Sequence, residues 1–268
     1  MSEPGTGPDL LVAAHAPPAA ARAAPVGYAP PGPLRPAPLD PALLWRRPDP
    51  VAPRPLSGPL ELYLAHARPR DERLLLRARE ILDAEERARA GAFRRDADRD
   101  VYVVAHTALR SVLGDLLGVR PDALPLMREP CAGCGGPHGR PALRGSGIHF
   151  SLSHSGDLVM MALARAPVGV DVERLAGVQA VLGAQSALHV AEVRELARLP
   201  EGERQAAFTR AWVRKEAYLK GLGTGLVRSP GLDYVGTGPV PAVPSPGWEL
   251  RDVRVPAGYA AAVALRTP

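Results

Sequence analysis

The pattern of apolar and polar positions divides most of the chain into short strands and helices. Residues 60–67, LELYLAHA, alternate between apolar and polar positions and predict a strand. Residues 72–95 are charged and predict a helical segment. In residues 100–118 apolar side chains recur on one stripe at helical spacing, and Gly118 and Pro121 follow as stop signals. The stripe comprises Val101, Val104, Ala105, Ala108, Leu109, Val112 and Leu116.

The second half of the chain groups its strands and helices in batches. Residues 119–147 are rich in loop-forming residues, and three strands are then predicted at about 148–152, 157–164 and 168–175. Two helices follow, at about 188–199 and 203–220, and a final pair of strands at 247–255 and 258–265. Because helices and strands come in separate batches, the pattern predicts an α+β fold rather than a doubly wound sheet.

The first 59 residues differ from the rest in composition. They hold 16 of the 31 prolines, among many alanines, and proline disfavours both helix interiors and strand ladders. We therefore predict a disordered or extended tail over residues 1–59, in which Leu43 to Trp45 could make a small contact with the folded part. Catalysis is not expected from this segment.

Composition points to a soluble protein of a reducing compartment. No apolar stretch reaches the roughly 20 residues of a membrane-spanning helix, and the N-terminal residues do not resemble a secretion signal. The two cysteines do not make a disulfide framework. We therefore expect a cytoplasmic protein that is not bound to a membrane.

The basic residues are almost all arginine. The net charge is +5, and of the 33 Lys and Arg residues only Lys215 and Lys220 are lysine. An excess of positive charge favours anionic partners, such as a phosphate-rich small molecule or an acidic protein. No basic run suited to nucleic acid stands out. Because lysine, unlike arginine, can lose its proton, the two lysines indicate a chemical role.

The segment VGVDVE, residues 168–173, combines a strand pattern with two acidic residues. Since side chains alternate along a strand, Gly169, Asp171 and Glu173 share one side, and the two carboxylates are roughly 6.5–7 Å apart. Oxygen ligands of this kind suit Mg²⁺ or Mn²⁺ rather than zinc. The alternative is a half-buried strand with a polar outer face.

The segment WVRKEAYLK, residues 212–220, places Glu216 and Lys220 four residues apart, as neighbours on one helix face. An ordinary surface ion pair would explain this spacing. However, Trp212 lies one turn earlier, so the pair borders the apolar face, and Lys215 is expected to lie deeper in the fold. These features favour a functional site.

Four segments in order resemble the 4′-phosphopantetheinyl transferases. VGVDVE and the later FTRAWVRKEAYLKGLGTGL are similar to the paired signature of the family, a Gly-hydrophobic-Asp element followed by W-x-x-K-E-(A/S)-x-x-K. PHGRPAL is similar to the Gly-Lys-Pro element of the long, Sfp-type branch, with Arg140 in place of lysine. FSLSHSGDLVMMALA is similar to its substrate-binding strand and turn. The resemblance covers roughly residues 60–266 and excludes the proline-rich segment.

The resemblance implies a fold and a reaction. Members of this family move the phosphopantetheine arm of coenzyme A onto a serine of an apo acyl or peptidyl carrier protein and release 3′,5′-ADP. It implies two similar α+β subdomains, residues 60–165 and 166–268, that form a pseudo-dimer with the substrate and metal between them. A monomer is expected. The carriers of fatty-acid, polyketide and nonribosomal-peptide synthesis are all candidates.

The resemblance also implies roles for individual residues. Asp171, Glu173 and Glu216 would hold Mg²⁺, or Mn²⁺, against the pyrophosphate of coenzyme A. Glu216, or a metal-bound water beside it, would take the proton from the carrier serine, and Lys220 would neutralise or protonate the leaving group. The residues expected to bind the phosphates and the nucleotide of coenzyme A are Ser153, His154, Arg140, Arg89 and Arg95, in addition to Lys220.

Other interpretations of the same residues remain open. The carboxylates would also serve a Mg²⁺-dependent nucleotide phosphohydrolase, and the charge would suit a non-catalytic protein that binds coenzyme A or nucleic acid. Cys131, Cys134 and His138 supply three zinc ligands without an evident fourth, so we expect a loop with spare thiols rather than a zinc site. The retention of every catalytic-type residue favours the transferase.

Overall fold

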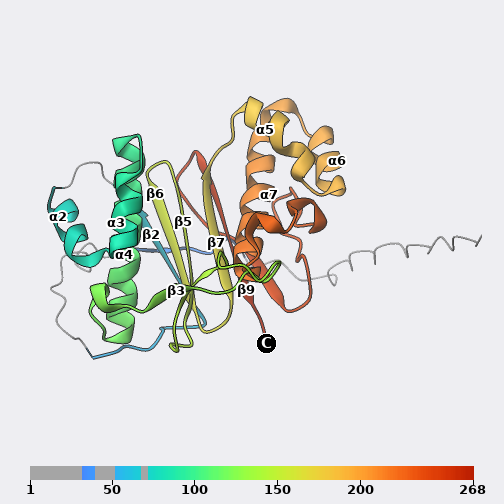
Figure 1. Ribbon diagram of the computed structural model, residues 1–268. Coiled ribbons are helices and arrows are strands. Elements are labelled where there is room, and N and C mark those ends of the chain that lie inside the picture. Colours follow the sequence, from blue (N-terminus) through green and yellow to red (C-terminus); the bar gives the residue numbers. More distant parts are fainter. Residues whose placement is uncertain (1–31, 40–51, 68–71) are drawn as a thin grey trace, which may run out of the picture. The chain divides into compact units, whose positions relative to one another are not determined.

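The structure, a computed structural model, describes residues 32–39, 52–67 and 72–268, of which residues 72–74 are described without their side chains. Nine strands and six helices longer than one turn are found there (Figure 1). The strands are β1 Ala37–Pro38, β2 Leu60–His66, β3 Leu126–Arg128, β4 Pro141–Leu143, β5 His149–Ser155, β6 Leu158–Ala164, β7 Val168–Arg174, β8 Trp248–Asp252 and β9 Tyr259–Arg266. The helices are α2 Glu72–Ile81, α3 Ala84–Gly91, α4 Asp96–Leu117, α5 Val178–Ala184, α6 Val190–Arg198 and α7 Glu201–Leu222. Within these residues, no helix combines the length and apolar character needed to cross a bilayer.

The main strands form two sheets, and helices pack on these sheets as further layers. One sheet has the order β1-β2-β6-β5, in which β2, β6 and β5 are antiparallel and β1 is parallel to β2. The other has the order β7-β9-β8 and is antiparallel throughout. The predicted α+β class is therefore confirmed.

Three of the apolar clusters show how these layers pack on one another. The side chains of α4 pack on the first sheet, where Leu109, Leu113 and Phe150 are buried. Those of α7 pack on the second sheet, where Ala211, Ala217 and Trp248 are buried. Between the sheets lies a third cluster, which includes Leu158, Met160, Val170, Val172 and Val263. The order of layers is thus helix, sheet, sheet, helix, as Figure 1 shows.

Serine hydroxyls connect the edge strands β5 and β7 where the two sheets meet. The backbone N–H groups of Val170, Val172 and Arg174 donate to serine Oγ atoms at 3.0, 3.4 and 3.2 Å. The acceptors are Ser151, Ser153 and Ser155, which alternate along β5. Side-chain acceptors therefore satisfy these N–H groups of β7.

Helix boundaries depart from the sequence prediction in two places. The helical segment predicted over residues 72–95 is two helices, because Asp83 caps α3: its carboxylate accepts from the N–H of Glu86, whose side chain in turn accepts from the N–H of Asp83. The short helix α5 was not predicted. The long helices α4 and α7 both end at a left-handed glycine, Gly118 and Gly223.

The described parts of residues 1–59, for which a disordered or extended chain was predicted, pair with the folded part of the chain. Leu34 pairs with Val253, and β1 pairs with β2. Arg54 forms 3.0 Å ion pairs with Glu61 and with Asp115. The prolines do not prevent β1 from pairing with β2, because β1 lies at a sheet edge, where a residue without a backbone N–H donor is tolerated. The contact predicted for residues 43–45 lies outside the described residues.

Candidate active site

Gly169 allows α7 to lie directly against β7. A Cβ atom at this position would lie 2.0 Å from the carbonyl oxygen of Ala217 and 2.4 Å from the amide nitrogen of Gly221. Any side chain would therefore push the helix away from the strand. The glycine of VGVDVE has a packing role, which brings the charged face of α7 onto the acidic side of β7.

Asp171 lies at the centre of the resulting site. Its side chain is 3 % exposed, and its Oδ1 atom accepts from Lys220 Nζ at 2.6 Å and from the Ser153 hydroxyl at 2.8 Å. Lys220 Nζ also lies 3.1 Å from the oxygen of Ser153. The other carboxylate oxygen, Oδ2, is buried and has no hydrogen-bond partner. A buried anionic oxygen without a partner is costly, and a bound cation would relieve this cost.

Lys220 reaches Asp171 rather than Glu216, so the ion pair considered from the helical spacing is not formed. Glu216 and Glu173 are half-buried, and both lie close enough to Asp171 to interact with its charge. Burial raises the pKa of Glu216, and the negative charge of Asp171 raises it further. Burial likewise raises the pKa of Glu173, against a 2.6 Å hydrogen bond from the Ser155 hydroxyl that lowers it. The site therefore concentrates negative charge that Lys220 alone does not balance.

The three carboxylates suit a hard divalent cation. They offer only oxygen ligands, and Oδ2 of Asp171 is a buried acceptor without a donor. Their oxygens do not all lie within 4.8 Å of one another, since Lys220 and the serines of β5 hold Asp171 and Glu173 in place. A cation would thus have to draw the carboxylates together. The donor set fits Mg²⁺ or Mn²⁺ and does not resemble a zinc site.

Ser153 and His154 point away from each other, as neighbours on a strand do. Ser153 is buried against Asp171 and Lys220, whereas His154 is exposed. Surrounding protein atoms lower the pKa of His154, and the nearby His106 and Lys220 lower it further. His154 is therefore kept neutral near pH 7, so one of its ring nitrogens donates a hydrogen bond and the other accepts one.

Arg140 connects the loop before β4 to the end of α7. Its Nε atom lies 2.6 Å from a carboxylate oxygen of Glu129, and its Nη1 atom donates to the carbonyl of Gly221 at 3.0 Å. Gly221 is the residue after Lys220. The structure thus places Arg140 beside the predicted site, but with its charge already paired.

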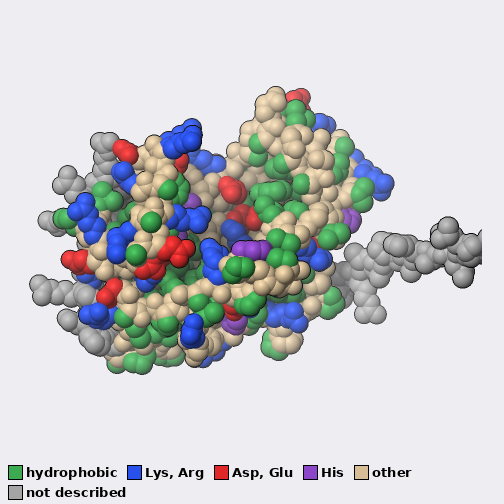
Figure 2. All heavy atoms as spheres, in the orientation of Figure 1, with side chains coloured by type: hydrophobic (Ala, Val, Ile, Leu, Met, Phe, Trp, Pro, Cys, Tyr) green, Lys and Arg blue, Asp and Glu red, His purple; other side chains and the backbone are tan. Residues whose placement is uncertain are grey.

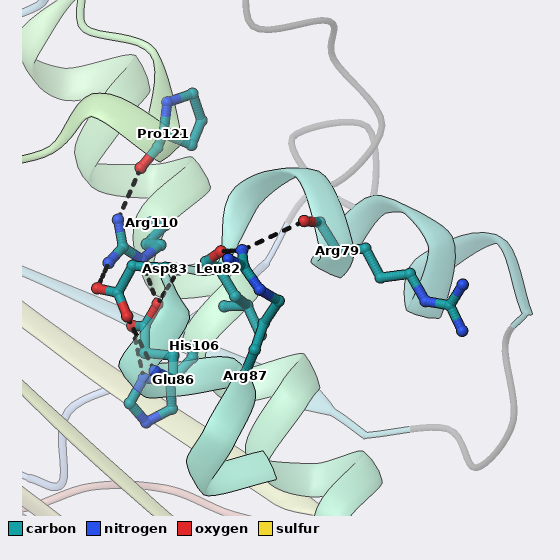
Figure 3. Close-up of polar contacts among 8 residues, drawn as sticks. All are labelled: Arg79, Leu82, Asp83, Glu86, Arg87, His106, Arg110 and Pro121. Carbon is teal, nitrogen blue, oxygen red and sulfur yellow. Dashed lines mark hydrogen bonds and ion pairs between the residues drawn. The ribbon is translucent and has the colours of Figure 1, made fainter. Parts of the chain in front are cut away.

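Arg89 and Arg95 are exposed, on α3 and at the N-terminal end of α4. The network in Figure 3 fixes α3 against α4: the buried Arg110 binds Glu86 at 2.6 Å, and also Asp83 and the carbonyl of Pro121. His106 lies 3.1 Å from the other oxygen of Glu86. Arg110 is therefore structural, and the network fixes the helix that carries Arg89.

Lys215, the second lysine, has no access to this site. It is 1 % exposed and forms a 2.7 Å ion pair with the fully buried Glu192, and it also donates to the carbonyls of Pro230 and Asp233. Burial lowers its pKa, while the charge of Glu192 opposes this shift. The prediction that Lys215 lies deeper is confirmed, and its role is to join α7 to α6 and to the following loop.

Two groups of residues at the site escaped the sequence analysis. Ser151 and Ser155 connect β5 to β7, and the recurrence of serine at every second position of FSLSHS was the available signal. Asp98 and His106 of α4 act electrostatically on His154, and no local pattern indicated this.

On the face drawn in Figure 2, the surface is hollowed between the parts that carry α4 and α7, and acidic, basic and histidine side chains meet there.

Comparisons with known proteins assign the chain to a family. Residues 167–238, which contain β7 and α7, match the family described as the 4′-phosphopantetheinyl transferase superfamily. The 4′-phosphopantetheinyl transferase HetI of Nostoc sp. is 31% identical over 192 residues, which cover 69% of this chain and 78% of HetI. The chain belongs to the 4′-phosphopantetheinyl transferase superfamily. The resemblance noted in the sequence is therefore confirmed, and the chain is an enzyme of this class.

Two further relatives of this transferase match over shorter lengths. The 4′-phosphopantetheinyl transferase gsp of Aneurinibacillus migulanus is 30% identical over 128 residues, 47% of this chain and 53% of gsp. The 4′-phosphopantetheinyl transferase psf-1 of Bacillus pumilus is 29% identical over 143 residues, 53% of this chain and 58% of psf-1. Both names agree with the superfamily assignment.

Proposed function

We propose that this enzyme transfers the 4′-phosphopantetheine arm of coenzyme A to a serine of an apo acyl or peptidyl carrier protein, with Mg²⁺, and releases 3′,5′-ADP. The observation that carries the proposal is the arrangement around Asp171. One oxygen of this carboxylate is bound by Lys220, and the other is buried without a partner. Two further carboxylates with raised pKa values lie beside it. This arrangement suits a cation and a pyrophosphate together.

Asp171, Glu173 and Glu216 would hold the cation. When bound, Mg²⁺ supplies positive charge that stabilises the pyrophosphate and the negative charge developing on the leaving phosphate. The raised pKa values of Glu173 and Glu216 support this assignment, because a cation would relieve the cost of keeping both groups charged.

Glu216 and Lys220 would carry out the proton transfers of the reaction. The serine hydroxyl of the carrier attacks the phosphorus atom attached to pantetheine, a new P–O bond forms, and the P–O bond to the adenosine phosphate breaks. Glu216 takes the proton of the hydroxyl, a role that its raised pKa favours. Lys220 donates a proton to the leaving phosphate oxygen or neutralises it. Its 30 % exposed side chain can reach solvent and substrate.

Coenzyme A would be bound along β5 and the loop before β4. The exposed and neutral His154 is suited to contact the ribose and the 3′-phosphate, together with the exposed Arg89 and Arg95. Arg140 can reach a phosphate if Glu129 releases it. Ser153 is buried between Asp171 and Lys220, so its contribution is to orient these two residues as substrate binds.

The two halves of the fold would be similar subdomains, residues 60–165 and 166–268, with the substrate between them. Each contains a helix of 22 residues, α4 or α7, that packs on an antiparallel sheet and ends at a left-handed glycine. The edge strands β5 and β7 meet at the boundary. We propose a monomer that acts in the cytoplasm on carriers of fatty-acid, polyketide or nonribosomal-peptide synthesis.

Intact-mass spectrometry of apo carrier proteins tests this function. Each carrier is incubated with the full chain, coenzyme A and Mg²⁺, with and without EDTA. We expect the carrier to gain the mass of one phosphopantetheine only with free Mg²⁺, and the gain to be lost with Asp171→Ala. A folded protein that binds coenzyme A but modifies no carrier would overturn the proposal. Cleavage of coenzyme A without a carrier would instead indicate a phosphohydrolase.

A further inference from the structure

The loop between β3 and β4 is a tightly bonded turn that carries both cysteines. Strands β3 and β4 pair from Leu126↔Leu143 to Arg128↔Pro141. Backbone bonds continue the hairpin beyond the strands: the N–H of Glu129 donates to the carbonyl of Arg140, and the N–H of Gly139 donates to the carbonyl of Glu129, both at 3.0 Å. The tip is therefore ordered by its backbone.

At this tip Cys131, Cys134 and His138 converge. One ligand atom from each residue lies within 4.8 Å of the other two, and they are the only such group of His, Cys, Asp and Glu in the described part of the chain. The Cys134 sulfur lies 3.0 Å from His138 Nε2. In a tetrahedral zinc site with ordinary bond lengths, ligand atoms are about 3.5–3.8 Å apart. The Cys134 and His138 atoms are thus closer together than in such a site, and one zinc ion would bind all three ligand atoms after these side chains shift slightly.

The backbone of the loop is arranged around the sulfur atoms. The N–H groups of Gly133 and Cys134 donate to the Cys131 sulfur. The N–H of Gly135 donates to the carbonyl of Cys131 at 2.8 Å, and Gly135 has the positive φ of 74° that this turn needs. A Cβ on Gly136 would lie 3.0 Å from the ring of His138. Glycine here leaves room for the imidazole beside Cys134.

We propose that Cys131, Cys134 and His138 bind a zinc ion, with a water molecule in the fourth position. Thiolate sulfur and imidazole nitrogen are the ligands that zinc prefers, whereas Mg²⁺ prefers oxygen. Binding releases the two thiol protons to solvent and involves no change of oxidation state. The expectation of a loop with spare thiols is replaced, because the fold brings the three ligand atoms together.

The zinc ion would secure the loop against the segment that follows α7. A Cβ on Gly133 would lie 3.3 Å from Val227 and 3.9 Å from Thr224, so the loop tip is in contact with that segment. From the same loop, Arg140 donates to the carbonyl of Gly221 at the end of α7. The metal would therefore hold two contacts to the helix that carries Lys220, although it takes no part in the chemistry.

Metal analysis of the purified full-length chain tests this proposal. The protein is loaded with zinc, dialysed against a weak chelator and measured by inductively coupled plasma mass spectrometry. We expect one equivalent of zinc per chain in the wild type and almost none with Cys131→Ser or Cys134→Ser. His138→Gln is expected to bind zinc about tenfold or more weakly. Loading with Co²⁺ should give the thiolate-to-metal charge-transfer band and the visible bands of a tetrahedral site.

Two controls separate this site from other zinc sites. His66→Gln removes an exposed histidine outside the loop, and Asp171→Asn alters the acidic site, so both should retain the full equivalent of zinc. Circular dichroism confirms that each variant is folded. Loss of zinc with Asp171→Asn but not with Cys134→Ser would overturn the proposal. The proposal would also be overturned if the wild-type protein, loaded with zinc under reducing conditions, held no zinc and had both thiols free.

Discussion

Lys220 Nζ lies 2.6 Å from Oδ1 of Asp171, although 49 residues separate them in sequence. The contact joins the two halves of the sequence signature, and it leaves Oδ2 of Asp171 as a buried acceptor without a donor. A carboxylate bound by a cation on one side and free on the other is poised to bind a second cation.

Lys220→Arg tests whether this lysine gives up a proton. Arginine keeps the positive charge beside Asp171, but it stays protonated throughout the working pH range. We expect kcat to fall about 100-fold, a common contribution of a general acid, with little change in KM for coenzyme A. Lys220→Met, which removes the charge as well, should also raise KM. Full activity of Lys220→Arg, measured by mass spectrometry of the carrier, would show that Lys220 acts by charge alone.

Glu216→Gln should stabilise the metal-free protein at neutral pH. The folded-state pKa of Glu216 is raised, so the folded state binds more protons than the unfolded state between the ordinary glutamate pKa, about 4.3, and the raised value. The contribution of protonated Glu216 to stability is complete below that window and is lost as pH rises through the folded pKa. Thermal unfolding should therefore show a Tm above wild type at pH 8 and equal to wild type near pH 4.

Adding Mg²⁺, and comparing a second glutamate variant, extend the stability measurement on Glu216→Gln. Mg²⁺ should raise the Tm of wild type at pH 8 more than that of Glu216→Gln. In Glu195, burial raises the pKa, but hydrogen bonds from Tyr234 and Thr237 outweigh it and leave the pKa lowered. Glu195→Gln should accordingly lower Tm at pH 8. A Glu216→Gln variant less stable than wild type at this pH would contradict the proposed charge crowding.

The sequence predicted the elements of the site better than their contacts. Alternation identified β7, and helical spacing identified α7, because both patterns are local. Spacing also suggested an ion pair between Glu216 and Lys220, but Lys220 contacts Asp171 instead. That contact depends on how closely α7 approaches β7, which Gly169 determines through packing. The distance between α7 and β7 cannot be predicted from the pattern of residues within either segment.

Contacts between distant segments explain the other differences. The proline-rich residues 32–39 and 52–59 were predicted to be disordered or extended, and their partners could not be read from the sequence. In the structure β1 pairs with the edge of β2, and Arg54 forms ion pairs with two carboxylates. The ligand atoms of Cys131, Cys134 and His138 converge because the loop closes on itself through Gly135 and Gly136. The sequence showed three ligands, but not their separation.

Lys215→Met should destabilise the protein strongly. It would leave Glu192 fully buried without its 2.7 Å ion-pair partner, and breaking a buried pair in this way costs about 3–5 kcal/mol. The double variant Lys215→Met with Glu192→Gln removes the uncompensated charge and should recover part of the loss. The midpoints of urea unfolding measure both effects. If the double variant were less stable than Lys215→Met, the buried charge would not be the cause.

Gly169→Ala should separate α7 from β7. The new methyl group would lie 2.0 Å from the carbonyl oxygen of Ala217, which belongs to helix backbone and cannot turn aside. Overpacking of this kind costs about 1–3 kcal/mol or more, and the displaced helix would also draw Lys220 away from Asp171. Gly183→Ala is the matched control, because its Cβ meets nothing within 4 Å in the helix α5. Alanine there should stabilise the protein by about 0.5–1 kcal/mol. Urea unfolding at equal protein concentration compares the two variants, and an unchanged midpoint for Gly169→Ala would show that the helix does not need this close approach.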